Sequence, residues 1–175
     1  MKKAIYHFIF FTYILIINSS LIIPFNFDDK EPEKMKGMIE RHNFWRSQYG
    51  LQNLIWSNEL AIVAQDWANE LAKRGCKMEH RPNNKFGENI YWSSGLQPTP
   101  KMVTDTWADE RQFYDFDKME CKLDWWKCGH FTQLMWSTTK KVGCGMAKCG
   151  NQEIWVCNYN PPGNWVGQKP FENKK

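Results

Sequence analysis

Residues 142–159 read VGCGMAKCGNQEIWVCNY, and this stretch decides the fold that the sequence predicts. It contains two runs of strand-like composition, 142–148 and 153–159. The dipeptide Gly150-Asn151 lies between them and is typical of a two-residue β-hairpin loop. The stretch therefore predicts an antiparallel hairpin whose register is set by its loop.

The same hairpin predicts a disulfide. Counting outward from the loop places Cys144 directly opposite Cys157, at an α-carbon separation of about 4.5–5.5 Å that a disulfide can span. Zinc is the alternative ligand, because Cys144 and Cys149 have the spacing of half a metal site, but no Cys/His pair stands at finger spacing to complete it. An even number of cysteines in an exported chain favours disulfides. The six are Cys76, Cys121, Cys128, Cys144, Cys149 and Cys157.

The N-terminus has the layout of a secretory signal peptide. Residues 1–3 include two lysines, residues 4–17 are almost wholly apolar, and residues 18–20 are small and polar, which is the order of regions in such a peptide. An uncleaved membrane anchor is the alternative, because residues 21–23 extend the apolar run. A membrane span needs about 20 apolar residues, so the polar interruption favours a signal peptide over residues 1–20.

Length and composition limit what the rest of the chain can be. At 175 residues it is long enough for one domain with a hydrophobic core. The formal net charge is +4 and the basic residues are scattered, whereas a nucleic-acid-binding protein normally gathers them on one face. We predict a lead-in over residues 21–33, one domain over 34–171 and a tail over 172–175, with no nucleic-acid partner.

Helices are predicted on both sides of a second strand. Apolar residues recur at helical spacing from Met35 to Tyr49, and Ser57 fits the N-cap of a helix that ends at Gly75. Thr99-Pro100 is typical of a third helix start. The first stripe comprises Met35, Met38, Ile39, His42, Trp45 and Tyr49, the third comprises Met102 or Val103 with Thr106, Trp107 and Glu110, and the strand covers 87–92. The chain is therefore a mixed helix and strand domain, with an antiparallel sheet and helices on its faces.

Four ionisable residues stand out as candidate site residues. They are His80, Glu88, Glu110 and His130. Imidazole and carboxylate groups in one cleft are suited to binding a divalent cation or to general acid–base work. Spacing alone does not show that the four meet. His42, on the first helical stripe, is expected to be a hydrogen-bonded core histidine.

Four motifs in this order resemble the CAP superfamily, which contains the cysteine-rich secretory proteins, antigen 5 and the pathogenesis-related type 1 proteins. They are HNFWR at 42–46, GENIY at 87–91, GHFTQLMW at 129–136 and CNYNPPGNW at 157–165. The resemblance runs from about residue 35 to residue 171. It is strongest to the compact pathogenesis-related type, without an extra cysteine-rich domain.

The resemblance implies an α+β fold, a three-layer α-β-α sandwich with a central antiparallel sheet. It also implies a cleft lined by His80, Glu88, Glu110 and His130, which in several relatives holds zinc or another divalent cation. The disulfides that it implies are Cys76–Cys149, Cys121–Cys128 and Cys144–Cys157. Thr132 and Gln133 are expected to tie the helix at 129–136 to neighbouring backbone.

Three functions follow from the resemblance. The first is a secreted, non-enzymatic binding module for a sterol or fatty acid, with Phe113, Tyr114 and Phe116 as the candidate lipid loop. The second is an effector or toxin-like ligand of a cell-surface receptor, with the loops at 97–100 and 117–126 giving specificity. The third is a metal-assisted hydrolase. Arg81 makes this hypothesis weaker, because many relatives have a serine at this position, directly after the first cleft histidine. We expect an extracellular monomer without a permanent membrane anchor.

Overall fold

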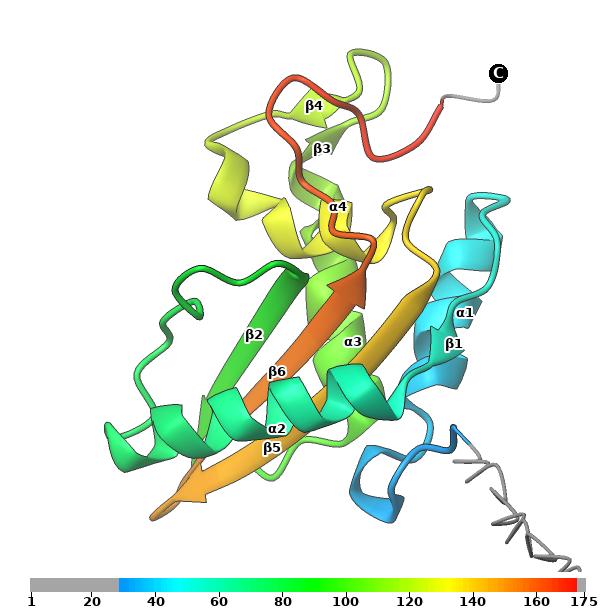
Figure 1. Ribbon diagram of the computed structural model, residues 1–175. Coiled ribbons are helices and arrows are strands. Elements are labelled where there is room, and N and C mark those ends of the chain that lie inside the picture. Colours follow the sequence, from blue (N-terminus) through cyan, green and yellow to red (C-terminus); the bar gives the residue numbers. More distant parts are fainter. Residues whose placement is uncertain (1–28, 173–175) are drawn as a thin grey trace, which may run out of the picture.

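The structure is a computed structural model that describes residues 29–172 (Figure 1). The expected signal peptide, over residues 1–20, lies outside this range. Among residues 29–172, no helix has the length and apolar character needed to cross a membrane.

The hairpin predicted from the sequence forms the middle of a four-stranded sheet with the order β1-β5-β6-β2 (Figure 1). Its strands pair in the predicted register, with Cys144 opposite Cys157 and an α-carbon separation of 4.1 Å. The outer strand β2 is antiparallel to β6, whereas the short β1 is parallel to β5. The strands are β1 Ile55–Trp56, β2 Gly87–Ser94, β5 Lys141–Cys149 and β6 Gln152–Asn160.

One face of this sheet is covered by helix α2, Asn58–Lys73 (Figure 1). The Ser57 side chain caps the helix by accepting a hydrogen bond from the Leu60 backbone nitrogen, as the sequence predicts. The helix lies directly on β5 because two strand positions have no side chain. A Cβ on Gly143 would lie 2.3 Å from the Ala61 backbone nitrogen, and one on Gly145 would lie 2.5 Å from the Gln65 Cα.

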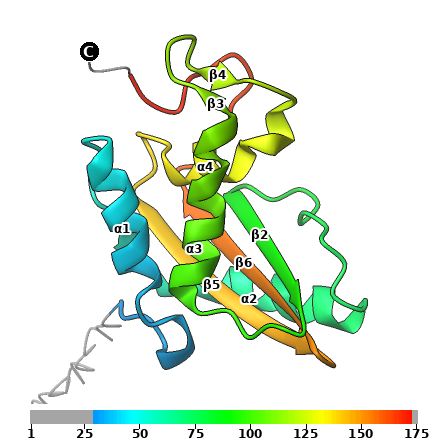
Figure 2. The same cartoon turned by 180° about the vertical axis from the view of Figure 1, so that it is seen from behind.

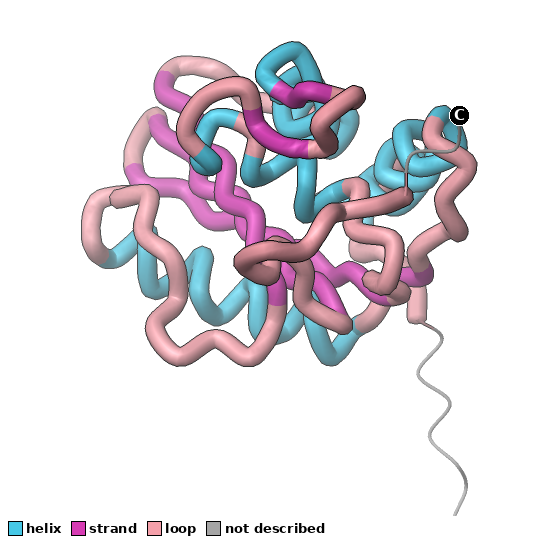
Figure 3. The backbone as a smooth tube through the Cα atoms, turned by 90° about the horizontal axis from the view of Figure 1, so that it is seen from above, coloured by secondary structure: helices cyan, strands magenta, loops and turns pink. Residues whose placement is uncertain are grey.

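Helices α1 and α3 cover the opposite face, so the molecule has the expected three layers (Figures 2 and 3). Alternation along β6 supplies both cores, since Trp155 and Tyr159 pack toward α1 and α3 while Ile154 and Val156 pack toward α2. The helices on this side are α1 Met38–Gln48, α3 Pro100–Asp109 and α4 Gly129–Leu134. Thr99 caps α3 through the Met102 backbone nitrogen.

A third apolar cluster lies at the end of the sheet where α4 begins. Its buried aromatic members are Tyr114, Phe131 and Phe171, and its aliphatic members include Leu134 and Met135. Above it lies a second, two-stranded sheet of β3 Tyr114–Asp115 and β4 Glu120–Cys121. Single turns of 3-10 helix complete the structure: η1 Glu33–Met35, η2 Glu110–Phe113 and η3 Trp125–Lys127.

The disulfides join the three pairs that the resemblance implies. Cys76–Cys149 connects the end of α2 to the end of β5, across an α-carbon distance of 6.1 Å. Cys121–Cys128 closes the short segment between β4 and α4, across 5.9 Å. No free cysteine occurs within the part of the chain that the structure describes.

Two helical faces differ from their predicted stripes. In α1 the fully buried side of the helix comprises Met38, His42 and Arg46, while Trp45 is only partly buried. In α3 Thr104 is buried and Thr106 is exposed, so the prediction for Thr106 was wrong. Arg46 and Thr104 are buried for the same reason: each donates a hydrogen bond to a backbone carbonyl, and such acceptors cannot be recognised from hydropathy.

Candidate functional site

The first pair of candidate residues joins the end of α3 to the start of α4. The carboxylate of Glu110 accepts hydrogen bonds from the backbone nitrogens of His130 and Phe131, at 2.9 and 3.2 Å. These amides belong to the first turn of α4, where no helical acceptor exists. The same carboxylate accepts from His130 Nδ1 at 2.6 Å. Glu110 therefore caps the helix and holds the imidazole, whose ring also stacks on Trp107.

The second pair lies between β2 and the loop that follows α2. Glu88 accepts a hydrogen bond from His80 Nδ1 at 2.7 Å, and others from the Arg81 backbone nitrogen and Asn84. Its side chain is 5% exposed, whereas that of His80 is 63% exposed. The carboxylate is thus fixed by the loop, and the imidazole projects outward.

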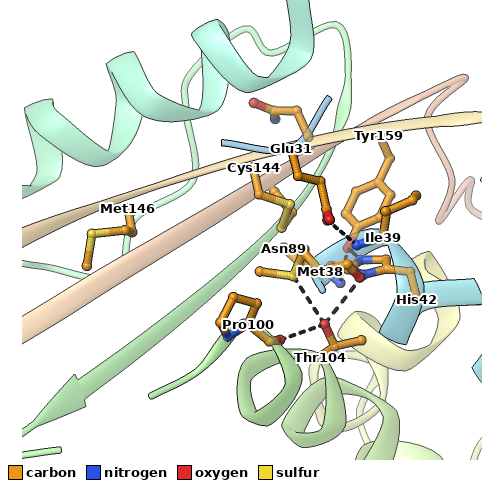
Figure 4. Close-up of a disulfide and its surroundings, with 12 residues drawn as sticks. Glu31, Met38, Ile39, His42, Asn89, Pro100, Thr104, Cys144, Met146 and Tyr159 are labelled. Carbon is orange, nitrogen blue, oxygen red and sulfur yellow. Dashed lines mark hydrogen bonds between the residues drawn. A yellow bond between two sulfur atoms is a disulfide. The ribbon is translucent and has the colours of Figure 1, made fainter. Parts of the chain in front are cut away.

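A chain of buried hydrogen bonds connects the carbonyl of His130 to the core. Figure 4 shows the part of this chain around His42, Tyr159 and Asn89. His42 Nδ1 lies 2.8 Å from the Met38 carbonyl, so this nitrogen carries the proton and donates. Its Nε2 then accepts from the Tyr159 hydroxyl at 2.9 Å. The Asn89 amide donates both to that hydroxyl and to the carbonyl of His130.

Burial determines how these core groups ionise. Removal from water lowers the pKa of His42, the hydrogen bond to the Met38 carbonyl partly opposes this, and the charge of Arg46 adds a smaller lowering, so that the pKa is about 4. Burial raises the pKa of Tyr159 far above its ordinary value. His42 is consequently a neutral core histidine, as the sequence predicts.

The polar residues of the 129–136 motif tie α4 to the C-terminal segment. Gln133 accepts a hydrogen bond from the Gly163 backbone nitrogen at 3.0 Å, and the Thr132 hydroxyl donates to Asn164 at 2.8 Å. The Asn164 amide in turn donates to the carbonyl of Gly129. Both side chains therefore have the structural role expected of them.

The three candidate lipid-loop aromatics lie over the third apolar cluster. Tyr114 is 1% exposed within the cluster, Phe113 is partly buried against it, and Phe116 is 37% exposed. The ring of Phe116 stacks on Tyr49 with an interplanar angle of 6°. Burial raises the pKa of Tyr114 to about 12, with Asp115 and Glu120 adding to the shift.

The α-β-α sandwich agrees with the comparison to known families. The model for "CAP: Cysteine-rich secretory protein family" matches residues 39–159. This chain belongs to that family.

Related CAP proteins include plant pathogenesis-related proteins. The chain is 40% identical over 131 residues to pathogenesis-related protein PR-1 of Medicago truncatula, and the match covers 74% of each protein. It is 33% identical over 161 residues to pathogenesis-related protein 1B of Nicotiana tabacum, covering 91% of this chain and 94% of that one.

Solved CAP structures have the same fold. Venom allergen-like protein 4 of Schistosoma mansoni superposes with a TM-score of 0.67 and 28% identity, over 83% of this chain and 97% of that one. NaASP2, crystallised with Zn²⁺, superposes with a TM-score of 0.66 over 83% of this chain and 88% of that one. Its 24% identity limits the likeness to the fold.

The zinc in that relative raises the question whether this CAP domain has a matching site. Within residues 29–172, no three His, Cys, Asp or Glu side chains gather closely enough to hold one metal ion. A carboxylate bound to Nδ1 leaves Nε2 as the ligand atom, which is the usual support for a metal-binding histidine. Each histidine–acid pair can thus provide one metal ligand, the histidine Nε2, with the acid holding the ring in place. The two pairs together do not fit a zinc site, which has three or four protein ligands.

One residue that the sequence reasoning missed is Arg46. It is fully buried and donates to the carbonyls of Gln52, Leu134 and Trp136 at 2.8 to 3.0 Å. Burial lowers its pKa to about 10, so it remains charged at neutral pH. A signal was present in the sequence, because Met38, His42 and Arg46 are spaced four apart on one helical face.

Proposed function

We propose that this CAP protein is a secreted, non-enzymatic binding module for a sterol or a related lipid. The ligand would occupy the third apolar cluster, beneath Phe116. The supporting observation is the Tyr114 hydroxyl, which is buried and has no hydrogen-bond partner among the described residues.

Such a hydroxyl is unusual, because nearly all buried polar groups in proteins are paired. Tyr114 lies among the rings of Phe131 and Phe171, with centroid distances of 5.5 and 6.1 Å. An apolar environment with one polar group is the usual chemistry of a site for a lipid alcohol. The raised pKa of Tyr114 keeps its proton in place, so it is a donor for a sterol hydroxyl.

The position of Phe116 supports access to this group. Its ring lies 5.2 Å from that of Tyr114 and is the most exposed of the three loop aromatics. A rotation of Phe116 away from Tyr49 would uncover the cluster. The cost of this movement is limited, because an exposed aromatic stack contributes about 0.5–1.5 kcal/mol beyond its buried area.

A binding role is favoured over hydrolysis by the residue next to His80. Arg81 stands where many relatives have a serine, and its guanidinium is bonded to Asp66 and to the carbonyl of Val63. The residue that follows His80 is therefore an arginine fixed by hydrogen bonds, and it supplies no hydroxyl group that could act as a nucleophile.

The test is a sterol titration of the secreted, oxidised protein, followed by displacement of a fluorescent sterol. We expect saturable binding with a Kd below about 10 μM. Tyr114→Phe should weaken it about fivefold, the value of one hydrogen bond, without lowering the melting temperature. Phe116→Ala should also weaken sterol binding, and Phe44→Ala is its control, because Phe44 is similarly exposed, at 44%, outside the cluster. Wild-type affinity in Tyr114→Phe would refute the site, and no binding by the native protein would shift the weight to the receptor hypothesis.

A further inference from the structure

The short segment closed by Cys121–Cys128 exposes an unusual amount of aromatic surface. Trp125 and Trp126 are 69% and 55% exposed, and Leu123 is 59% exposed. The two indole rings pack edge to face, with centroids 6.2 Å apart. The disulfide and the η3 turn give this segment a defined shape, so the exposed rings belong to a preformed surface.

A second exposed apolar segment adjoins the first. Trp165 is 55% exposed and Val166 is fully exposed. They follow Asn164, whose amide donates to the carbonyl of Gly129 at 2.8 Å, while the Trp125 ring lies beside the same glycine. In Figure 1 the C-terminal segment runs beside α4, β3 and β4, at the end of the molecule that also carries η3.

We propose that these two segments form a docking surface for the headgroup region of a phospholipid bilayer. We call it the tryptophan surface, and it comprises Leu123, Trp125, Trp126, Trp165 and Val166. This proposal goes beyond the lipid-binding function and does not depend on it. Tryptophan favours the membrane–water interface because its ring is apolar and its N–H group is polar.

The charges around the tryptophan surface favour a lipid partner over a protein partner. Exposed lysines and acids alternate with the apolar residues, whereas the cores of protein interfaces are depleted of both. At a bilayer, lysine stems can lie along the apolar region while their ammonium groups reach water. The exposed charged residues over 117–127 are Lys118, Lys122 and Lys127 against Asp117, Glu120 and Asp124.

This charge balance also selects the kind of membrane. Three positive and three negative side chains leave the segment with no net charge, so attraction to anionic lipids is not the driving force. Binding should come from insertion of the tryptophan and aliphatic side chains. We therefore infer that zwitterionic phosphatidylcholine is sufficient for docking.

The position of the surface relates it to the third apolar cluster. Cys121 begins the loop and is paired with Tyr114 across β3 and β4. A bilayer bound at Trp125 and Trp126 would therefore face the same end of the molecule as Phe116. Docking there would bring a membrane lipid next to the cluster.

The experiment is co-sedimentation of the secreted, oxidised protein with sterol-free phosphatidylcholine vesicles, so that its result is separate from sterol binding. The main variant is Trp125→Ala with Trp126→Ala. Trp92→Ala is the matched control, because Trp92 is 41% exposed and lies toward the other end of β2. We expect the partition coefficient to fall at least about tenfold in the double variant and to stay within about twofold in the control.

Two further measurements distinguish insertion of the tryptophan surface from misfolding of the variants. Brominated phosphatidylcholine should quench the tryptophan fluorescence of the native protein more strongly than that of the double variant. Trp165→Ala with Val166→Asp leaves the disulfide segment intact and should also weaken partitioning. Equal melting temperatures are required for both variants.

Three results would overturn the proposal. One is a native protein that stays in the supernatant with phosphatidylcholine vesicles. Another is binding that needs phosphatidylserine and disappears in 0.5 M salt, which would indicate a basic surface. The third is a double variant that binds vesicles normally but loses a dimer seen by size-exclusion chromatography, which would make the surface a protein interface.

Discussion

Lowering the pH should destabilise this protein through His42. The side chain is fully buried, and burial lowers its pKa from 6.5 to about 4. The unfolded chain therefore binds a proton at a higher pH than the folded protein does. The free energy of unfolding contains the full contribution of this residue above pH 6.5, and loses it as the pH falls from 6.5 toward 4.

The size of the effect follows from the shift. A difference of about 2.5 pKa units corresponds to about 3 kcal/mol when the loss is complete. Between pH 7.5 and pH 5.0 about 2 kcal/mol of this is lost, because the folded state still excludes the proton at pH 5.0. Two neighbours disfavour the protonated ring: the Tyr159 hydroxyl donates to Nε2, the atom that would take the proton, and the charge of Arg46, already included in the shift, opposes a second cation.

The assay is urea unfolding at pH 7.5 and pH 5.0 with the disulfides intact, for the native protein and for His42→Gln. Glutamine is neutral at both values and retains a donor and an acceptor. It should lower stability at pH 7.5 yet lose about 2 kcal/mol less than the native protein on acidification. The exposed His80 and the His130–Glu110 pair are present in both proteins, so their contributions cancel.

An equal loss in the two proteins would refute this prediction. It would mean that His42 is protonated in the folded state near pH 6, which requires water or an acceptor at Nε2 in place of the Tyr159 proton. Tyr159→Phe tests whether the Tyr159 hydroxyl, rather than water or another acceptor, lies at Nε2. It should lower stability at both pH values by about 2 kcal/mol, because it removes two buried hydrogen bonds, one to His42 and one from Asn89.

Two further predictions concern packing and metal. Gly145→Ala should cost at least about 2 kcal/mol in urea unfolding, because its Cβ would meet the backbone of α2 at 2.5 Å. Gly129→Ala, with its nearest neighbour at 3.7 Å, is the control and should change stability by less than about 0.5 kcal/mol; equal costs would show that α2 can move away. Calorimetric titration with Zn²⁺ should show only weak binding, with a Kd above about 1 μM. Only the double variant His80→Ala with His130→Ala should abolish it, because each histidine–acid pair offers one supported ligand. A nanomolar Kd would show that the four site residues converge on one ion.

The sequence predicted the local features of this fold well. The loop at Gly150-Asn151 set the register of β5 and β6, and Ser57 and Thr99 cap the helices that they were expected to cap. These features depend on neighbouring residues, through turn geometry and the orphan backbone groups of a helix end. A short stretch of sequence contains all of the information that they need.

The candidate site was predicted less completely. The sequence singled out Glu110 and His130, but not that Glu110 caps α4 through two backbone amides. It also missed Arg46, because a charged residue on an apolar stripe looks like an exposed one until its three carbonyl partners are placed around it. The parallel strand β1, only two residues long, carries too little periodicity to detect.

The sequence by itself determined the hairpin, the Cys144–Cys157 pairing, the starts of α2 and α3 and, through its motifs, the CAP family. Only the tertiary structure decided which groups meet: Glu88 with His80, Glu110 with α4, and the Tyr114 hydroxyl with an apolar cluster that offers it no partner among the described residues. The physical reason is range. Periodicity and turns are set by covalent neighbours, whereas hydrogen bonds between distant segments exist only after three layers have packed and excluded water from the groups between them.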